Sequence, residues 1–311
     1  MNLVRKMSVA LAAIVGLSLT SGAMAADKMN LRKVTDGVYM MENARGSSNS
    51  TFVITPDGVL VFDFDIRTAD QTLAEIRKLT DKKVRYLVSS HSAGDHATGA
   101  WHFREDKPVY IASRPQVRDL FMQESEEFEK RKSESDDYKG KELVRPDIGF
   151  DNKLTLYFGG LTFDITFEGT GHSNGDTTIY IPQKRVFLAG DLLDTEIHPG
   201  QGSSGNTYFS LVDSWMGLLD KVIARNLPVD TYIPGHGPVH IGRGVADLQE
   251  QKRYFITIRN EVTKRIQEGK SLAQIRKELT KLPGEFANYK RGSRLRNFID
   301  RTYYQVQGKG Y

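Results

Sequence analysis

The stretch Ser89–Gly99 reads SSHSAGDHATG and places two histidines and an aspartate within six residues. It follows the apolar run Val84–Val88, which predicts a short buried strand. Imidazole nitrogen and carboxylate oxygen bind zinc at about 2.0–2.2 Å. Because a strand fixes the backbone, side chains just beyond its end are well placed to converge on one point. The stretch therefore indicates part of a metal site at the end of a strand.

Three later segments repeat this combination of a strand end, a glycine and a ligand-type side chain. They are GTGHSNGD at residues 169–176, VFLAGD at 186–191 and PGHG at 234–237. A lone histidine at a strand end is more often structural, so the prediction depends on the four segments together. Strand ends that meet at one edge of a sheet bring their ligands together. The predicted metal ligands are His91, Asp95, His96, His172, Asp191 and His236.

The first 25 residues contain the three parts of a secretory signal peptide. Arg5 and Lys6 form a basic start, Val9–Leu19 is apolar, and Ala23–Ala25 is a small-x-small cleavage site. We therefore expect cleavage after Ala25 and a periplasmic mature protein. No later run is long and apolar enough to predict a membrane span.

Residues 26–311 are long enough to form one large α/β domain with its own core. The chain has no cysteine, so a metal site must use nitrogen and oxygen ligands. The formal charge of +4 is too small to predict nucleic-acid binding. Lysine and arginine do gather in residues 281–311, which we interpret as a solvated helix face. Contact with anionic lipid or an acidic partner is the alternative for this segment.

The order of the predicted elements indicates two sheets covered by helices. Strand-like runs are found at residues 51–54, 59–62, 84–88, 108–112, 154–158, 161–167, 177–181, 185–188 and 230–233. Helical spacing is found at residues 68–79, 116–132, 209–224, 245–269, 271–279 and 293–304.

The four motifs, in this order, resemble those of the metallo-β-lactamase superfamily from about Val34 to His240. The resemblance implies an α/β fold, specifically an αββα sandwich of two mixed sheets flanked by helices. It also implies a metal site along one edge of the sheets, with Asp191 as the carboxylate that bridges two ions. The first ion would use His91 and His172, and the second would use Asp95, His96 and His236.

One position departs from the family pattern, whose first motif is His-x-His-x-Asp-His. Its middle histidine falls on Ala93, so the first site keeps three of its four ligands and the second keeps all four. We therefore expect one tightly held Zn²⁺ ion and a second ion that is bound weakly or is absent. His198, seven residues beyond Asp191, is interpreted as a surface loop residue, and the alternative is that it swings in to replace the missing imidazole.

The resemblance implies hydrolysis of a small-molecule substrate by a zinc-activated water, with Asp95 as the catalytic residue that orients it or shuttles a proton. The scissile bond would belong to an ester, thioester, lactam or lactone. The esters considered include carboxylic, sulfuric and phosphoric esters. An alternative is an Fe²⁺-dependent sulfur dioxygenase of the same superfamily, because His91, His172 and Asp191 form a two-histidine, one-carboxylate triad. A non-enzymatic metal- or ligand-binding protein is the third hypothesis.

Substrate contacts are expected from two glycine-containing loops at residues 43–49 and 199–206. Arg45 in the first loop is a candidate for binding an anionic group. The charged segment 124–137 either covers the site or covers only the rest of the domain.

Overall fold

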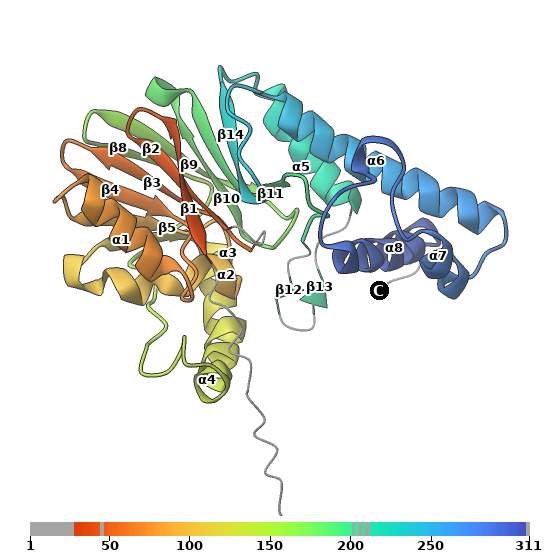
Figure 1. Cartoon of the computed structure of the whole chain (residues 1–311), viewed down its shortest axis with the longest axis horizontal. Helices are drawn as coiled ribbons and strands as arrows, with labels where there is room; N and C mark the ends of the chain where they lie inside the picture. The colour runs from red at the N-terminus through yellow and green to blue at the C-terminus, as the bar shows by residue number, and fades with distance from the viewer. Residues whose placement is uncertain (1–27, 44–46, 201–202, 205–206, 209–211, 309–311) are drawn as a thin grey trace, which may run out of the picture.

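The computed structural model describes residues 28–43, 47–200, 203–204, 207–208 and 212–308. Two mixed β-sheets lie against each other, and helices cover their outer faces (Figure 1). The predicted αββα sandwich is therefore confirmed. The proposed signal peptide lies outside the described residues, and so does Arg45.

The first sheet has seven strands in the order of the chain. They are β1 (Met29–Thr35), β2 (Val38–Asn43), β3 (Ser50–Thr55), β4 (Gly58–Phe62), β5 (Val84–Val88), β6 (Val109–Ser113) and β7 (Ile148–Phe150). Strands β1 to β4 are antiparallel, whereas β4 to β7 run parallel. The parallel part requires crossover connections, and α1 (Ala69–Leu79) supplies the first of them.

The second sheet has five strands in the order β14, β11, β10, β9, β8. Their bounds are β8 (Lys153–Phe158), β9 (Leu161–Gly169), β10 (Asp176–Ile181), β11 (Val186–Asp194) and β14 (Thr231–His236). Alternate residues of both sheets point into the space between them, where Leu60 and Val53 join Ile179 and Leu188 in one apolar cluster. This cluster holds the sheets face to face and aligns their edges.

Helices enclose the sandwich and extend it at the C-terminal end (Figure 1). Those after the first sheet's strands are α2 (Gly94–Ala97), η1 (Gly99–Asp106), α3 (Arg114–Asp119), η2 (Leu120–Glu124) and α4 (Ser125–Glu134). Those of the second half are α5 (Val212–Ala224), α6 (Ala246–Gln267), α7 (Leu272–Glu278) and α8 (Gly292–Val306). Trp215 of α5 packs against Phe255 of α6 and Phe298 of α8. No helix in the described ranges is long and apolar enough to cross a membrane.

The segment that precedes α8 is joined to the segment that follows β11. The amide of His198 donates to the carbonyl of Lys290 over 2.9 Å, and the amide of Lys290 donates to Glu196 over 3.1 Å. These bonds form an isolated parallel bridge between Ile197 and Lys290. As a result, the start of α8 lies close to the end of β11, where Asp191 and Asp194 are found.

Candidate metal centre

The structure brings all six predicted ligands together at one edge of the two sheets. His91 follows β5, Asp95 and His96 lie on α2, and His172 lies between β9 and β10. Asp191 and His236 belong to the adjacent parallel strands β11 and β14. Five of the six side chains are almost fully buried, whereas the Asp95 side chain is 30% exposed.

Asp191 lies at the centre of this cluster. Its Oδ2 atom is 3.3 Å from Nε2 of His172, 3.3 Å from Nε2 of His236 and 4.0 Å from Nε2 of His91. Its Oδ1 atom is 3.2 Å from Nε2 of His96. One carboxylate therefore faces four imidazoles. Two of them, His91 and His172, belong to the first predicted site, and the other two, His96 and His236, belong to the second.

The remaining distances match those between ligands of one ion. Nε2 of His96 is 3.3 Å from Nε2 of His236, and Oδ2 of Asp95 is 3.7 Å and 3.5 Å from these two nitrogens. Atoms that each bind a tetrahedral ion at about 2.0–2.2 Å are roughly 3.3–3.6 Å apart. The spacing therefore fits a divalent metal between these side chains.

Three buried atoms of the cluster also lack the partner that buried polar atoms normally have. Among the described residues, Nε2 of His91, Nδ1 of His172 and Oδ1 of Asp191 have no hydrogen-bond partner. The ligand atoms of His91, His172 and Asp191 form one group with all distances below 4.8 Å, and those of Asp95, His96 and His236 form another. Both groups have the donor types that zinc and iron accept.

The protonation states of His91, His172 and Asp191 suit metal binding. Burial and the neighbouring His96 lower the pKa of His91 to about 4, and burial holds the pKa of His172 well below its usual value. Both rings are therefore neutral and have a lone pair to donate. Burial alone would raise the pKa of Asp191, but the surrounding histidines hold it well below its ordinary value. The carboxylate is thus ionised and acts as an acceptor. At His96 and His236 burial lowers the pKa, but the neighbouring carboxylates, Asp191 first among them, outweigh it and raise the pKa, so an ion bound there must displace a proton.

Asp63, which directly follows β4, was not predicted as part of the site. Its Oδ2 atom accepts a hydrogen bond from Nδ1 of His96 over 2.9 Å, and its Oδ1 atom accepts from the amide of Ser90 over 2.6 Å. Carboxylates that hold the second nitrogen of a metal-binding histidine fix its tautomer and orientation. The signal was present in the sequence, because Asp63 follows the apolar run Val59–Phe62 just as Asp191 follows its own strand.

Asp176, part of the quoted motif but given no role, shapes the loop that carries His172. Its carboxylate accepts hydrogen bonds from the amides of Gly171 and His172 over 3.0 Å and 2.7 Å. Burial nevertheless raises its pKa to about 7. This carboxylate therefore positions His172 without contacting the centre of the cluster.

Asp194 is a further carboxylate that the sequence analysis missed, since β11 extends beyond its predicted end. Its ligand atom forms a third close group with those of Asp191 and His236. Burial and the negative charge of Asp191 raise its pKa to about 6. One of its oxygens accepts from the amide of Gly200 over 2.9 Å.

Two residues were predicted to bear on the site that lacks a histidine: Ala93, which stands at the missing position, and His198. Ala93 precedes α2 and lines the cavity above the cluster. His198 is only 3% exposed, so its interpretation as a surface loop residue is wrong. It is buried because its Nδ1 atom is hydrogen-bonded to the hydroxyl of Tyr254 over 2.8 Å and its ring packs beside Tyr289.

A cavity of about 630 Å³ opens above the six candidate ligands. Segment 124–137 does reach it, through Glu124 and Arg131. Arg291 and Arg294 also line it, so part of the basic segment 281–311 faces this cavity and is not simply a solvated helix face. The sequence could not predict that these charged side chains line the cavity, because charged residues on a helix usually face solvent.

A cluster of histidines and carboxylates at the edge of an αββα sandwich defines a class of metal-binding proteins. The model of the metallo-β-lactamase superfamily matches residues 43–236, so the chain belongs to this superfamily. Among curated relatives, it is 25% identical to a type 2 metallo-β-lactamase from Bacteroides fragilis over 222 residues, covering 68% of this chain and 80% of the relative. A type 2 enzyme from Elizabethkingia meningoseptica is 21% identical, covering 75% and 89%.

Solved structures show the same fold. An inverting sec-alkylsulfatase from Pseudomonas aligns with a TM-score of 0.69 and 18% identity over 90% of this chain. The chain spans about half the length of that sulfatase, since the alignment covers 50% of it. A metallo-β-lactamase from Pontibacter korlensis aligns with a TM-score of 0.57 and 18% identity, covering 73% of this chain and 99% of that one.

Proposed function

We propose that this protein is an exported, zinc-dependent hydrolase of a small molecule with an ester, thioester, lactam or lactone bond. One observation supports this proposal more than any other. Six ligand-type side chains converge beneath an open cavity, and only Asp95 among them has a substantially exposed side chain, 30% accessible. A carboxylate that faces both the ligand cluster and the cavity is suited to proton transfer during hydrolysis.

The family supports hydrolysis as the general chemistry. The superfamily includes hydrolytic enzymes, and the relatives named above are β-lactamases and an alkylsulfatase. When bound, zinc would supply a water with a pKa near 7 and hence a hydroxide at neutral pH. His96, His236, Asp95 and Asp191 are proposed to hold the tighter ion, and His91 and His172 would complete a weaker site with Asp191.

The experiment is a substrate panel offered to zinc-loaded protein. It contains p-nitrophenyl acetate, sulfate and phosphate, a thioester, a β-lactam and a lactone. We expect at least one to be hydrolysed. At equal zinc content, Asp95→Asn should lower kcat by about 10²–10⁴-fold because a general base is lost. Asp136→Asn, on an exposed loop, is the matched control. Absence of zinc-dependent turnover across the panel would count against the proposal.

The iron alternative is retained because His91, His172 and Asp191 form a compact group of their own. It is tested by offering glutathione persulfide to iron-loaded and zinc-loaded protein in an oxygen-electrode cell. We expect no oxygen uptake with either metal. Rapid uptake with iron alone, abolished by His172→Ala but not by His236→Ala, would replace the hydrolase proposal with a dioxygenase.

Export is the part of the proposal that depends on residues 1–25. Cell fractionation should recover the protein from the periplasm of a Gram-negative host, with Ala26 as its first residue by N-terminal sequencing. A full-length protein retained in the cytoplasm would contradict the signal-peptide prediction.

A further inference from the structure

Four arginines from separate parts of the chain line the cavity above the metal ligands. Arg67 follows β4, Arg131 lies on α4, and Arg291 and Arg294 lie at the start of α8. The whole chain has a formal charge of only +4, so this concentration does not reflect a generally basic protein. The arginines share the cavity with the carboxylates of Asp95, Glu124 and Asp191, two of which are candidate metal ligands, so a bound metal would leave the arginine charge in excess.

Two of these arginines are fixed by carboxylates and a hydroxyl. The guanidinium of Arg67 donates to both oxygens of Asp65 at 2.9 Å. Arg131 donates to Glu127 over 2.9 Å and to the hydroxyl of Tyr138 over 3.0 Å. These contacts hold the two side chains in place at the rim, which lowers the entropy cost of binding a ligand there.

Arg294 is positioned by main-chain contacts. Its Nη1 atom donates to the carbonyl of His198 over 3.5 Å. A Cβ atom on Gly200 would lie 3.2 Å from the same Nη1, so the guanidinium packs closely against this glycine. In the described part of the chain, no ion pair joins Arg294 to a carboxylate. Its charge acts on the buried carboxylate of Asp194, where it partly offsets the rise in pKa that burial and Asp191 cause, and its side chain also lines the cavity.

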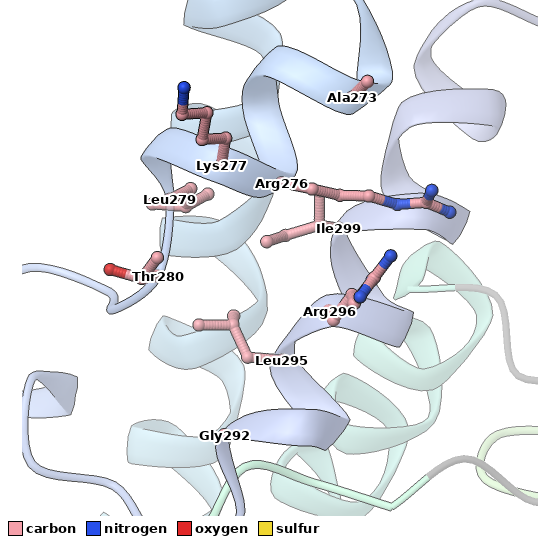
Figure 2. Close-up of a pocket in the computed structure, with 9 residues that line it drawn as sticks. All are labelled: Ala273, Arg276, Lys277, Leu279, Thr280, Gly292, Leu295, Arg296 and Ile299. Atoms are coloured by element: carbon pink, nitrogen blue, oxygen red, sulfur yellow. The ribbon is translucent and has the colours of Figure 1, made fainter.

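Helix α8 separates its basic side chains between two faces. Arg291, Arg294 and Asn297 follow at intervals of three residues and all line the cavity. Arg296 instead lines a groove between α7 and α8, together with Arg276 and Lys277 (Figure 2). Arg296 therefore has the same charge on the same helix but lies in a different pocket.

We infer that Arg291 and Arg294, with Arg67 and Arg131 at the rim, bind the tetrahedral oxyanion of a sulfate or phosphate monoester substrate. Guanidinium groups present a planar fork of donors that matches such oxyanions. Among the described lining residues only Ala93 has an apolar side chain, which favours a compact and polar ligand. Hydrolysis of R–O–SO₃⁻ by water would give the alcohol ROH and hydrogensulfate, and a phosphate ester would give ROH and hydrogenphosphate.

The identification of the substrate rests on the proposed function, but anion binding is measured separately. Inorganic sulfate and inorganic phosphate are titrated into zinc-loaded protein by calorimetry at low ionic strength, with zinc content checked for every variant. We expect Arg291→Gln and Arg294→Gln each to weaken anion binding about ten-fold or more, since each removes a charged hydrogen-bond donor. Arg296→Gln, the matched control, should stay within two-fold of wild type.

Arg294→Lys supplies a second variant that keeps the charge and removes the fork, and it should lie between wild type and Arg294→Gln. The anion that binds more tightly indicates the ester class. The inference is overturned if neither anion binds the wild-type protein, or if the Arg291 and Arg294 variants bind as wild type does. It is also overturned if Arg296→Gln weakens binding equally.

Kinetics distinguish this inference from the proposed function. Arg294→Gln should lower kcat/KM for p-nitrophenyl sulfate or phosphate about ten-fold while leaving p-nitrophenyl acetate within two-fold. Anion binding that depends on Arg291 and Arg294, without hydrolysis of any member of the substrate panel, would support the anion site and refute the hydrolase. Equal losses for charged and neutral esters would refute the anion site and leave the hydrolase intact.

Discussion

Nδ1 of His96 lies 2.9 Å from Oδ2 of Asp63, and this contact directs Nε2 of the same ring toward Asp191 and His236. Asp63 has a φ of 62°, in the left-handed region that aspartate tolerates better than most residues. The turn after β4 thus presents a carboxylate beneath the ligand cluster. The end of β4 therefore supplies Asp63 as a positioning residue, and the segment after β5 supplies His96 as the candidate ligand.

Asp63→Asn should weaken zinc binding about 10- to 100-fold, because an amide cannot replace the charge that orients and polarises His96. Zinc affinity is measured by competition with a fluorescent chelator. Asp106→Asn is a matched control, since Asp106 is also buried but accepts from the amide of Val84. The Asp106→Asn substitution should lower the free energy of unfolding and leave the zinc affinity unchanged. Equal zinc affinities of Asp63→Asn and wild type would contradict the role given to Asp63.

Gly235, just before His236, should not tolerate a side chain. A Cβ atom there would lie 2.0 Å from Oδ1 of Asp191 and 2.7 Å from the carbonyl carbon of Gly190. We expect Gly235→Ala to lower the free energy of unfolding by about 1–3 kcal/mol and to reduce bound zinc. Urea denaturation and metal analysis check both effects.

The control for this substitution is Gly217→Ala on α5, where an added Cβ would meet no atom within 4 Å. It should stabilise the protein by about 0.5–1 kcal/mol, because alanine favours a helix interior over glycine. A neutral Gly235→Ala would show that Asp191 can move without cost.

The six candidate ligands could be selected from the sequence because each lies close to a predicted strand end and a glycine. His172, Asp191 and His236 directly follow a glycine, and His91 follows the strand Val84–Val88, which was predicted with its observed bounds. Most strands of both sheets were predicted from strand-like apolar runs, but β1 and β7 were not. Strand β11 also extends to Asp194, six residues beyond its predicted end at Leu188.

The surroundings of the ligands were less predictable because they depend on contacts between distant segments. Arg131 and Arg294 lie on charged helices, where sequence spacing cannot distinguish a solvated face from the wall of a cavity. His198 was misinterpreted for the same reason, since its burial depends on Tyr254 of α6 and Tyr289, each more than fifty residues away. Such positions follow from packing and not from a local pattern.

His198 should make stability depend on pH without any role in metal binding. Burial lowers its pKa to about 4, below its ordinary value of 6.5. The unfolded chain therefore binds a proton that the folded protein resists, so stability is full above pH 6.5 and falls as the pH drops toward 4. His198→Gln should reduce this slope by at most about 1.4 kcal/mol per pH unit.

The measurement is urea denaturation of metal-free protein between pH 4 and 7. His240 supplies a control of opposite sign, because its hydrogen bond to Asp247 raises its pKa. Its contribution is present below pH 6.5 and is lost as the pH rises through the folded-state pKa. If His198→Gln and wild type show the same slope, the burial of His198 has no such consequence.

Restoring a histidine at position 93 should restore the depleted site. Ala93 lines the cavity beside the ligand cluster, so an imidazole there would join His91, His172 and Asp191. We expect Ala93→His to retain two equivalents of zinc after dialysis against a mild chelator. Ala93→Leu, of similar bulk but without a ligand atom, should retain one. If Ala93→His gains no zinc, Ala93 does not explain the stoichiometry.

The most direct test of the central claim, that the ligand set of Asp95, His96, His236 and Asp191 holds the tight ion, is zinc content per chain after chelator dialysis. Mass spectrometry of the metal should find one equivalent in wild type and in His91→Ala, and nearly none in His236→Ala. Two equivalents in wild type, or a greater loss from His91→Ala than from His236→Ala, would contradict the account.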